Sequence, residues 1–319
     1  MKKMTNVLAF VASLALVASV FACKNNAGGN GAGGGTGGGG GTTVPTASAG
    51  SSAGFVKISA GSMPLNSDGS YRVTLTKAFE ICDHEVTQHE WQDVMENNPS
   101  NFQDDAATGE TQHLRPVEQV SWYDAIAYCN KRSVKEGFQP CYSVQIDDGA
   151  GNKVEIDWKI LKYADIPTDD NADWNAAICD FNKTGYRLPT EAEWEIAARG
   201  GLTGDVYAGT DDVNKLGDYA WYTTNSDSKT HEVKKKLPNG YELYDMSGNV
   251  YEWCWDWHGN YASEDATDPT GAAPGSSRVV RGGSWDNPTS GCSASNRETA
   301  GSPANSFSIA GIRLVRTAL

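Results

Sequence analysis

Two blocks near the carboxyl end decide the fold: Arg281-Gly282-Gly283-Ser284-Trp285 and Gly311-Ile312-Arg313-Leu314-Val315-Arg316. Between them stand the 25 residues 286–310, most of them small or polar, with almost no apolar periodicity. Two well-defined blocks that enclose an irregular stretch predict a rigid frame around a surface made of loops. Whether this surface performs chemistry or binds a ligand decides the function of the protein.

The first 54 residues predict an export signal and a tether. A basic start and an apolar run over 7–22 are typical of a signal peptide at residues 1–22, and the run is too short to span a membrane. Cys23 follows in a Val-x-Ala-Cys pattern that resembles the lipobox of bacterial lipoproteins, which implies a lipid on Cys23. An ordinary signal peptide is the alternative. Residues 23–54 are rich in glycine and small polar residues, so we expect a flexible tether.

Composition limits the partners of the remaining chain, residues 55–319, which is long enough for one large domain. The net charge of −14 argues against nucleic acid and against anionic lipid headgroups as partners. Six cysteines follow Cys23 without a Cys-x-x-Cys pair, which argues against a zinc knuckle. They form disulfides or remain buried thiols, and the sequence leaves both possibilities open.

Local patterns predict short helices followed by a long run of loops and strands. Alternating apolar residues predict two strands within 55–75. Helices are expected to begin after Thr87, Ser121 and Thr190, the last with a glutamate three residues on, as in a capping box. Few residues in 201–319 show helical periodicity, so the domain is predicted to be α+β and rich in loops.

Six blocks, in order along the chain, resemble the formylglycine-generating enzyme (sulfatase-modifying factor) family. They are Glu85–Thr87, Pro116–Trp122, Gly185–Trp194, Asp245–Trp253, Arg281–Trp285 and Gly311–Arg316. Together they span nearly all of 55–316. The resemblance implies a loop-rich, C-type-lectin-like fold of the formylglycine-generating-enzyme type over residues 55–319.

The resemblance also implies an oxidase, which is the alternative function. Oxidases of this family bind copper through two cysteines near the C-terminal segment and oxidise a cysteine of their sulfatase substrate. Cys292 matches the second cysteine, but Asn287 stands where the first is expected. Because Cu(I) prefers two thiolates and an amide does not replace one, we expect no copper and no catalytic residue, with Cys292 as a vestige.

One block implies a calcium site. The family holds Ca²⁺ there through a side-chain oxygen, two backbone carbonyls and a glutamate, and the matching residues are Asp245, Gly248, Val250 and Glu252. Oxygen ligands suit a hard cation. We expect at most one structural Ca²⁺ at this block and no other required cofactor; a simple buried turn is the alternative.

The string from His84 to Glu90 resembles a zinc-protease motif only superficially. Its two histidines, His84 and His89, are five residues apart rather than four. About 140° of helix rotation therefore separates them, so we expect this pair not to share a metal.

A second branch of the fold uses the C-terminal segment as a variable ligand surface. The chain resembles these variable proteins of diversity-generating retroelements, in particular the Treponema variable lipoproteins. Their adenine-directed codons never yield Lys, Glu, Gln, Met or Trp. These five types occupy 47 of the 227 positions in 55–281, but only Glu298 occurs among the 25 positions of 286–310. The deficit favours a diversified segment at about 285–310; an ordinary polar loop is the alternative.

We therefore predict an exported lipoprotein of the bacterial outer membrane or cell surface. It is a non-catalytic, receptor- or adhesin-like protein that binds an unknown protein or glycan, with the membrane contacted through its lipid. Trp285 is expected to pack beneath the segment, and Cys292, Asn296 and Arg297 to belong to the scaffold. The residues expected to face the ligand are Asp286, Asn287, Pro288, Ser290, Gly291, Ser293, Ser295, Thr299, Ala300, Asn305, Ser306 and Ser308.

Overall fold

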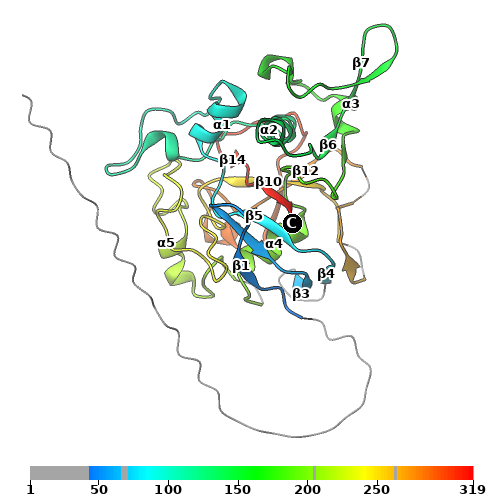
Figure 1. Ribbon diagram of the computed structural model, residues 1–319. Helices are drawn as coiled ribbons and strands as arrows, with labels where there is room; N and C mark the ends of the chain where they lie inside the picture. Colours follow the sequence, from blue (N-terminus) through cyan, green and yellow to red (C-terminus); the bar gives the residue numbers. More distant parts are fainter. Residues whose placement is uncertain (1–42, 66–70, 204–205, 262–263, 273, 319) are drawn as a thin grey trace, which may run out of the picture. The chain divides into compact units, whose positions relative to one another are not determined.

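The computed structural model describes residues 43–65, 71–203, 206–261, 264–272 and 274–318 (Figure 1). The predicted signal peptide (1–22), the lipidated Cys23 and most of the tether lie outside the described residues. Among the described residues, no helix combines the length and the apolar character that crossing a bilayer takes.

One antiparallel sheet joins the beginning and the end of the described chain. Its order is β1-β2-β5-β15, and its strands are β1 (Ala47–Ala49), β2 (Phe55–Ile58), β5 (Phe79–Cys82) and β15 (Val315–Thr317). Val315 lies opposite Ile81 in this sheet. The end of the second frame block is therefore part of a sheet with the first strands of the chain.

The strand β1 corrects the predicted tether boundary. We expected residues up to 54 to lack regular structure, yet Ala47 pairs with Ile58 and Ala49 with Val56. In addition, the backbone N–H of Gly50 donates to the carbonyl of Phe55. A backbone ladder needs no large apolar side chains, so the composition of this stretch concealed a strand at the edge of the sheet.

A second sheet carries the C-terminal segment. Its order is β13-β12-β10-β14, and its strands are β10 (Tyr251–Trp257), β12 (Arg278–Arg281), β13 (Arg297–Thr299) and β14 (Ala310–Gly311). Glu252 of β10 lies opposite Arg281 on one side and Gly311 on the other. Both frame blocks therefore flank the same strand. The strand β13 lies inside the segment that showed no periodicity.

The remaining strands form a third sheet, one hairpin and one further antiparallel pair. The third sheet, in the order β11-β4-β3, contains β3 (Gly61–Leu65), β4 (Tyr71–Leu75) and β11 (Ala266–Thr267). Both strands predicted within 55–75 are present as β2 and β4, but they belong to different sheets. In the stretch 140–182, β7 (Gln145–Asp147) and β8 (Lys153–Glu155) form a hairpin, and β6 (Tyr142–Ser143) pairs with the more distant β9 (Ile178–Cys179).

The three main helices begin at the predicted caps. Thr87, Ser121 and Thr190 each accept the backbone N–H three residues on, in a reciprocal capping box. The helices are α1 (Gln88–Met95), α2 (Trp122–Lys135) and α4 (Glu191–Arg199). Shorter helical turns are α3 (Ala172–Asn175), α5 (Leu216–Tyr219), η1 (Gln112–Leu114), η2 (Tyr163–Asp165), η3 (Val213–Lys215) and η4 (Thr289–Cys292).

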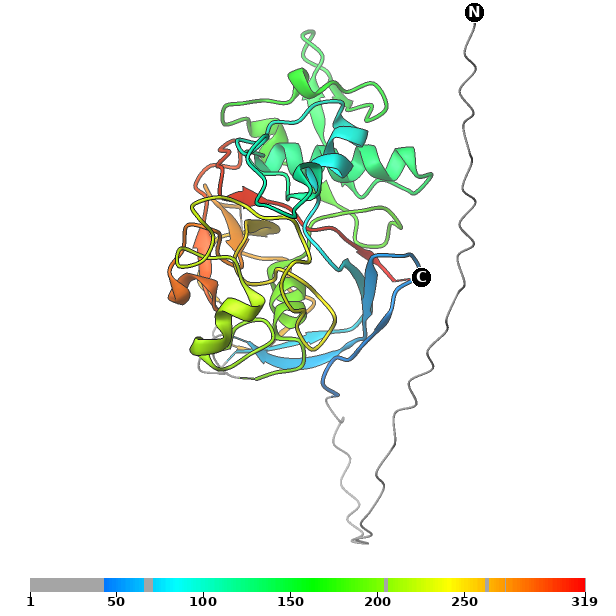
Figure 2. The ribbon, with the colours of Figure 1, turned by 90° about the vertical axis from the view of Figure 1, so that its left-hand side faces the viewer.

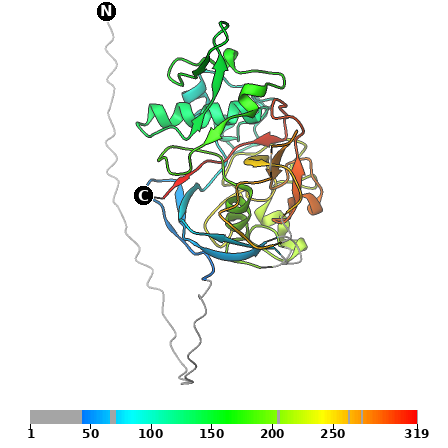
Figure 3. The same ribbon diagram turned by 90° about the vertical axis from the view of Figure 1, so that its right-hand side faces the viewer.

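Two apolar clusters form the core. One lies around α1, α2 and β10 and contains the buried Trp91, Trp122 and Trp253; the other lies around α4 and β2–β5 and contains Trp194. Figures 2 and 3 show α1 and α2 at one end of the domain and the C-terminal segment, drawn in orange, on the side opposite the C-terminus. The six cysteines of the described residues are all unpaired, as in the buried-thiol interpretation.

Candidate binding groove

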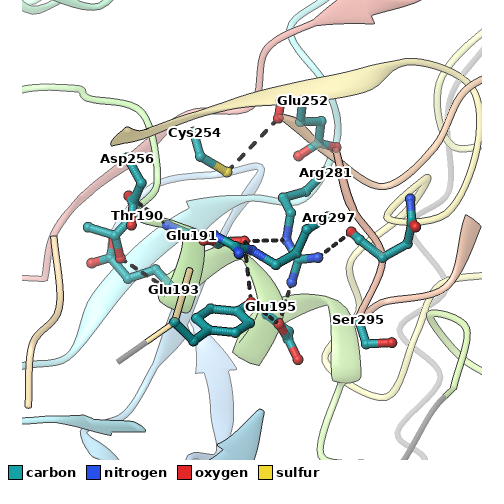
Figure 4. Close-up of polar contacts among 12 residues, drawn as sticks. Thr190, Glu191, Glu193, Glu195, Glu252, Cys254, Asp256, Arg281, Ser295 and Arg297 are labelled. Carbon is teal, nitrogen blue, oxygen red and sulfur yellow. Dashed lines mark hydrogen bonds and ion pairs between the residues drawn. The ribbon is translucent and has the colours of Figure 1, made fainter. Parts of the chain in front are cut away.

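Buried ion pairs fix the first frame block to helix α4. The Arg281 guanidinium contacts Glu195, with both side chains fully buried, and its Nε lies 3.5 Å from Glu191 Oε1. Arg297, in the segment, binds Glu191 through two nitrogens, with Nη2 at 2.7 Å from Oε2. Figure 4 shows both arginines directed toward the acidic face of α4. Two-nitrogen contacts of this kind compensate the cost of burying the charges.

A second buried pair fixes the other frame block to β10. Arg313 Nη2 lies 2.7 Å from Glu252 Oε1, and its Nη1 donates to the Cys82 carbonyl at 3.0 Å. Trp194 Nε1 donates to the remaining Glu252 oxygen at 2.6 Å. Both charged side chains are at most 1% exposed. The two frame blocks are thereby anchored to carboxylates that lie outside the segment between them.

Between the frame blocks the surface is hollowed into a groove of about 580 Å³. Its floor consists of side chains that are almost completely buried, and its rim includes the exposed Glu298, Thr299 and Phe307. We call this feature the groove. The residues that line it are Tyr251, Val280, Asn287, Glu298, Thr299, Ala300, Gly301, Asn305, Phe307, Ile309 and Ala310.

Four of the twelve predicted ligand-facing residues line the groove: Asn287, Thr299, Ala300 and Asn305. Ser306 lines a neighbouring cavity of about 180 Å³ beside the start of α2. The other seven do not line the groove; they are Asp286, Pro288, Ser290, Gly291, Ser293, Ser295 and Ser308.

The segment between the frame blocks has two parts, because residues 288–295 do not line the groove. They include η4, whose Cys292 is fully buried against Leu216, Ala220 and Tyr222. The scaffold residues have their own contacts. Asn296 Nδ2 donates to the Gly291 carbonyl at 3.2 Å, and Trp285 Nε1 donates to the Ser308 carbonyl at 3.0 Å.

Sequence reasoning missed the apolar part of the groove. Tyr251 and Val280 come from β10 and β12, outside the segment, and Phe307 and Ile309 come from its last residues. Phe307 is 39% exposed, which is unusual for a phenylalanine. The alternation of Phe307 and Ile309 just before the second frame block was the available signal.

The polar groups of the groove suit recognition. The Asn287 amide oxygen accepts from the Ser284 hydroxyl at 2.6 Å, and Asn287 also contacts the Tyr251 hydroxyl. Burial, with a contribution from Glu298, raises the pKa of Tyr251 to about 12, so its hydroxyl stays protonated at neutral pH. Among the described residues of the lining, Glu298 carries the only charge. The groove therefore offers hydroxyl, amide and carboxylate groups over an apolar floor.

Cys292 does not present a reactive thiol. It is fully buried, and its Sγ lies 3.0 Å from the position that a Cβ on Gly283 would take. Burial raises the pKa of Cys292 to about 12, so the thiolate that would bind Cu(I) is scarce at neutral pH. Asn287, in place of the other cysteine, is engaged by Ser284. This arrangement gives no two-thiolate copper site.

The geometry disfavours the predicted calcium site. Both oxygens of Glu252 are already bound by Arg313 and Trp194, so this glutamate has no oxygen left for a cation. Asp245 is more suitable, because its buried Oδ1 has no hydrogen-bond partner among the described residues while Oδ2 accepts from the Lys234 backbone. Of the four residues, Glu252 has both oxygens engaged and Asp245 has one without a partner among the described residues, and the calcium site stays a prediction.

The fold and the groove together define a class: a loop-rich α+β domain whose C-terminal segment builds a recessed surface on a rigid frame. Residues 41–318 match the family described as the sulfatase-modifying factor enzyme 1-like domain, and the chain belongs to that family. The match begins before residue 55, in agreement with the strand β1. The expected fold class, a C-type-lectin-like fold of the formylglycine-generating-enzyme type, is confirmed.

The chain is similar to three proteins whose names describe different kinds of protein. The chaperone protein LppX of Paenibacillus barcinonensis is 37% identical over 233 residues, which cover 67% of this chain and 71% of that protein. A formylglycine-generating enzyme of Streptomyces coelicolor is 42% identical over 125 residues, which cover 35% of this chain and 40% of the enzyme. The solved structure of Treponema denticola variable protein 1 has a TM-score of 0.77 at 47% identity, covering 86% of this chain and 100% of that one.

Proposed function

We propose that this protein binds a ligand in the groove and performs no oxidation. The observation that carries the proposal is the chemistry of the groove, whose lining holds neither a cysteine nor a histidine among the described residues. Asn287 occupies the position of one copper-binding cysteine, and Cys292 is buried in the core. The similarity to a variable protein and to a chaperone protein supports the same conclusion.

The proposed ligand is a protein or a glycan. A groove of about 580 Å³ is of the size that accommodates a few amino-acid side chains or a sugar unit. Its apolar floor suits the face of a ring or an aliphatic side chain, and the amides of Asn287 and Asn305 suit hydrogen-bonding groups.

A groove-filling variant tests this proposal. Ala300→Trp places a large side chain in the groove, and Ile178→Trp, at a 67% exposed position outside it, is the matched control. The purified protein is screened against a printed glycan array and a random peptide display library. We expect ligands whose affinity falls at least tenfold in A300W and is unchanged in I178W. Ligands that bind both variants equally, or an absence of ligands in both screens, would contradict the proposal.

We further propose that the protein is an exported lipoprotein anchored through Cys23. The support is the apolar run over 7–22 followed by the Val-x-Ala-Cys pattern. Growth of the source bacterium with an alkyne fatty acid should label the wild-type protein and not the Cys23→Ser variant. Equal labelling of both proteins would refute acylation at this residue.

Diversification of the segment 286–310 is a separate part of the proposal. The similarity to a variable protein and the deficit of five residue types support it. Sequencing of the neighbouring DNA should reveal a reverse transcriptase gene and a near-identical repeat that differs at adenines. Flanking DNA without either would count against diversification while leaving ligand binding untouched.

An oxidase is the second candidate, favoured by the similarity to formylglycine-generating enzymes. The protein is incubated with Cu(I), oxygen and a peptide that carries the cysteine of a sulfatase. We expect no aldehyde, because two thiolates are required and the two positions that match the copper-binding pair hold one buried thiol, Cys292, and the amide Asn287. Aldehyde formed over several turnovers would establish the oxidase instead.

A further inference from the structure

The side chains of three consecutive residues converge at the end of β5, and none of them lines the groove. Cys82 Sγ lies 3.6 Å from His84 Nδ1, and Asp83 Oδ1 lies 2.5 Å from the same nitrogen. Neighbouring residues of a strand point to opposite faces, so this convergence requires the chain to leave the strand at Cys82. One ligand atom from each of the three lies within 4.8 Å of the other two.

The imidazole of His84 is held in a defined orientation. Its Nε2 lies 3.4 Å from Glu90 Oε2 on α1, and Glu90 is itself fixed by the Thr87 backbone N–H at 2.9 Å and by Arg132 at 3.3 Å. A carboxylate on one ring nitrogen retains the proton there and directs the other nitrogen toward the shared point. Metal-binding histidines commonly have such a carboxylate behind them.

The spacing of the donors suits a tetrahedral ion. Zinc bonds of about 2.3 Å to sulfur and about 2.0–2.1 Å to nitrogen hold those two atoms about 3.5 Å apart. The observed separation between Cys82 and His84 is 3.6 Å. The Asp83 oxygen has to withdraw by somewhat less than about 1 Å to reach its tetrahedral position. Its other oxygen lies 2.8 Å from Nζ of Lys234, and the long, 40% exposed lysine side chain is able to follow this movement.

We propose that Cys82, Asp83 and His84 form a zinc site, with Glu90 as a positioning residue and water in the fourth position. A sulfur, a nitrogen and an oxygen donor suit a borderline divalent ion and exclude Ca²⁺ or Mg²⁺, which take oxygen ligands. His84 and Asp83 are 18% and 15% exposed, which leaves the ion a path from solvent.

The charges around the site suit a divalent cation. The carboxylates of Asp83 and Glu90 face His84 from two sides, at 2.5 Å and 3.4 Å from its ring nitrogens. Lys234, at 2.8 Å from the other oxygen of Asp83, is 40% exposed, so its ammonium group is able to move toward solvent when the ion binds.

His89 belongs to a different contact. Its ring packs against that of His113, with centroids 5.4 Å apart, on the outer side of α1. The pair of histidines considered in the sequence thus does not form a site, and His84 uses other partners. His89 therefore provides a matched control.

Cobalt titration of the reduced, purified protein tests the site, because a cobalt–thiolate bond gives a charge-transfer band in the near ultraviolet. We expect one equivalent of Co²⁺ to produce this band and tetrahedral d–d bands, and Zn²⁺ to abolish both. Cys82→Ser should remove the charge-transfer band, and His84→Gln should weaken binding about 100-fold. His89→Gln and Cys254→Ser should behave as wild type.

Two further measurements distinguish a loss of metal binding from a loss of folding. Affinity should rise at least tenfold per pH unit near neutrality, because at least one proton is released. Glu90→Gln should change this pH profile while retaining the cobalt spectrum, which a merely structural role would not do. An undiminished charge-transfer band in folded C82S, or an absence of stoichiometric Co²⁺ and Zn²⁺ binding by the wild-type protein at pH 7–8, would overturn the proposal.

Discussion

The frame blocks and the segment between them differ in what holds them. Arg281 and Arg313 are fully buried and bind carboxylates of α4 and β10. Glu298, Thr299 and Phe307, which lie between these two arginines in the chain, are exposed and line the groove. Because the ion pairs of Arg281 and Arg313 lie in the frame, we expect the side chains that line the groove to change without loss of the fold. The same stretch of chain thus supplies both the anchor and the surface of the groove.

The two halves of the segment differ in a similar manner. Residues 288–295 place Cys292 in the core, and the backbone N–H of Ala294 donates to the Val206 carbonyl. Residues 298–310 border the groove. The part of the segment that lines the groove, which is Asn287 and residues of the second half, is smaller than the ligand surface that the sequence predicted.

Breaking the frame should have the largest effect. Arg313→Met leaves the carboxylate of Glu252 buried without its ionic partner. We expect a loss of about 3–5 kcal/mol in the free energy of unfolding, measured by urea denaturation. Lys215→Met, at an exposed position, is the control and should change the free energy by less than about 0.5 kcal/mol. If R313M is as stable as K215M, the frame does not anchor the segment.

The buried carboxyl group of Asp256, in β10, should make the free energy of unfolding depend on pH. Burial and the neighbouring Glu191 raise the pKa of Asp256 to about 8, whereas an unfolded aspartate has a pKa of about 4. Between these values the folded state holds a proton that the unfolded state has released, so stability falls as pH rises from 4 to 8.

Asp256→Asn removes this dependence. The difference in unfolding free energy between D256N and wild type should shift in favour of the variant by on the order of 1–2 kcal/mol from pH 5 to pH 8. Urea denaturation at the two values measures it. A difference that is constant with pH would show that Asp256 titrates normally.

Changes in the groove should have the smallest effect on stability. The triple variant Thr299→Ala, Asn305→Ala and Phe307→Ala removes side chains from the rim, each at an exposed position. We expect a loss below about 1.5 kcal/mol, because surface substitutions typically cost about 0.5 kcal/mol each. A loss comparable to that of R313M would mean that these residues hold the fold rather than a ligand.

The sequence predicted the parts of the molecule that depend on local rules. The caps at Thr87, Ser121 and Thr190 start helices because a hydroxyl and a carboxylate three residues on satisfy the first backbone groups. The family was recognisable from short blocks of fixed residues. The strand β1 escaped detection because its pairing uses only the backbone.

The groove was predicted in part, for a physical reason. Thr299 and Asn305 were identified because they lie in the polar segment, but Tyr251 reaches the groove from β10 through strand pairing that no local pattern reveals. Conversely, Ser290 and Ser293 look like loop residues in the sequence, and the burial of Cys292 carries them away from the groove.

We infer that the buried frame specifies the fold and that the groove lining is free to vary, and two libraries displayed on cells test this inference directly. One library randomises Thr299, Ala300, Asn305 and Phe307; the other randomises Glu195, Glu252, Arg281 and Arg313. Survival of protease treatment reports folding. The account predicts that most clones of the first library survive and that very few of the second do, whereas equal survival of the two libraries would contradict it.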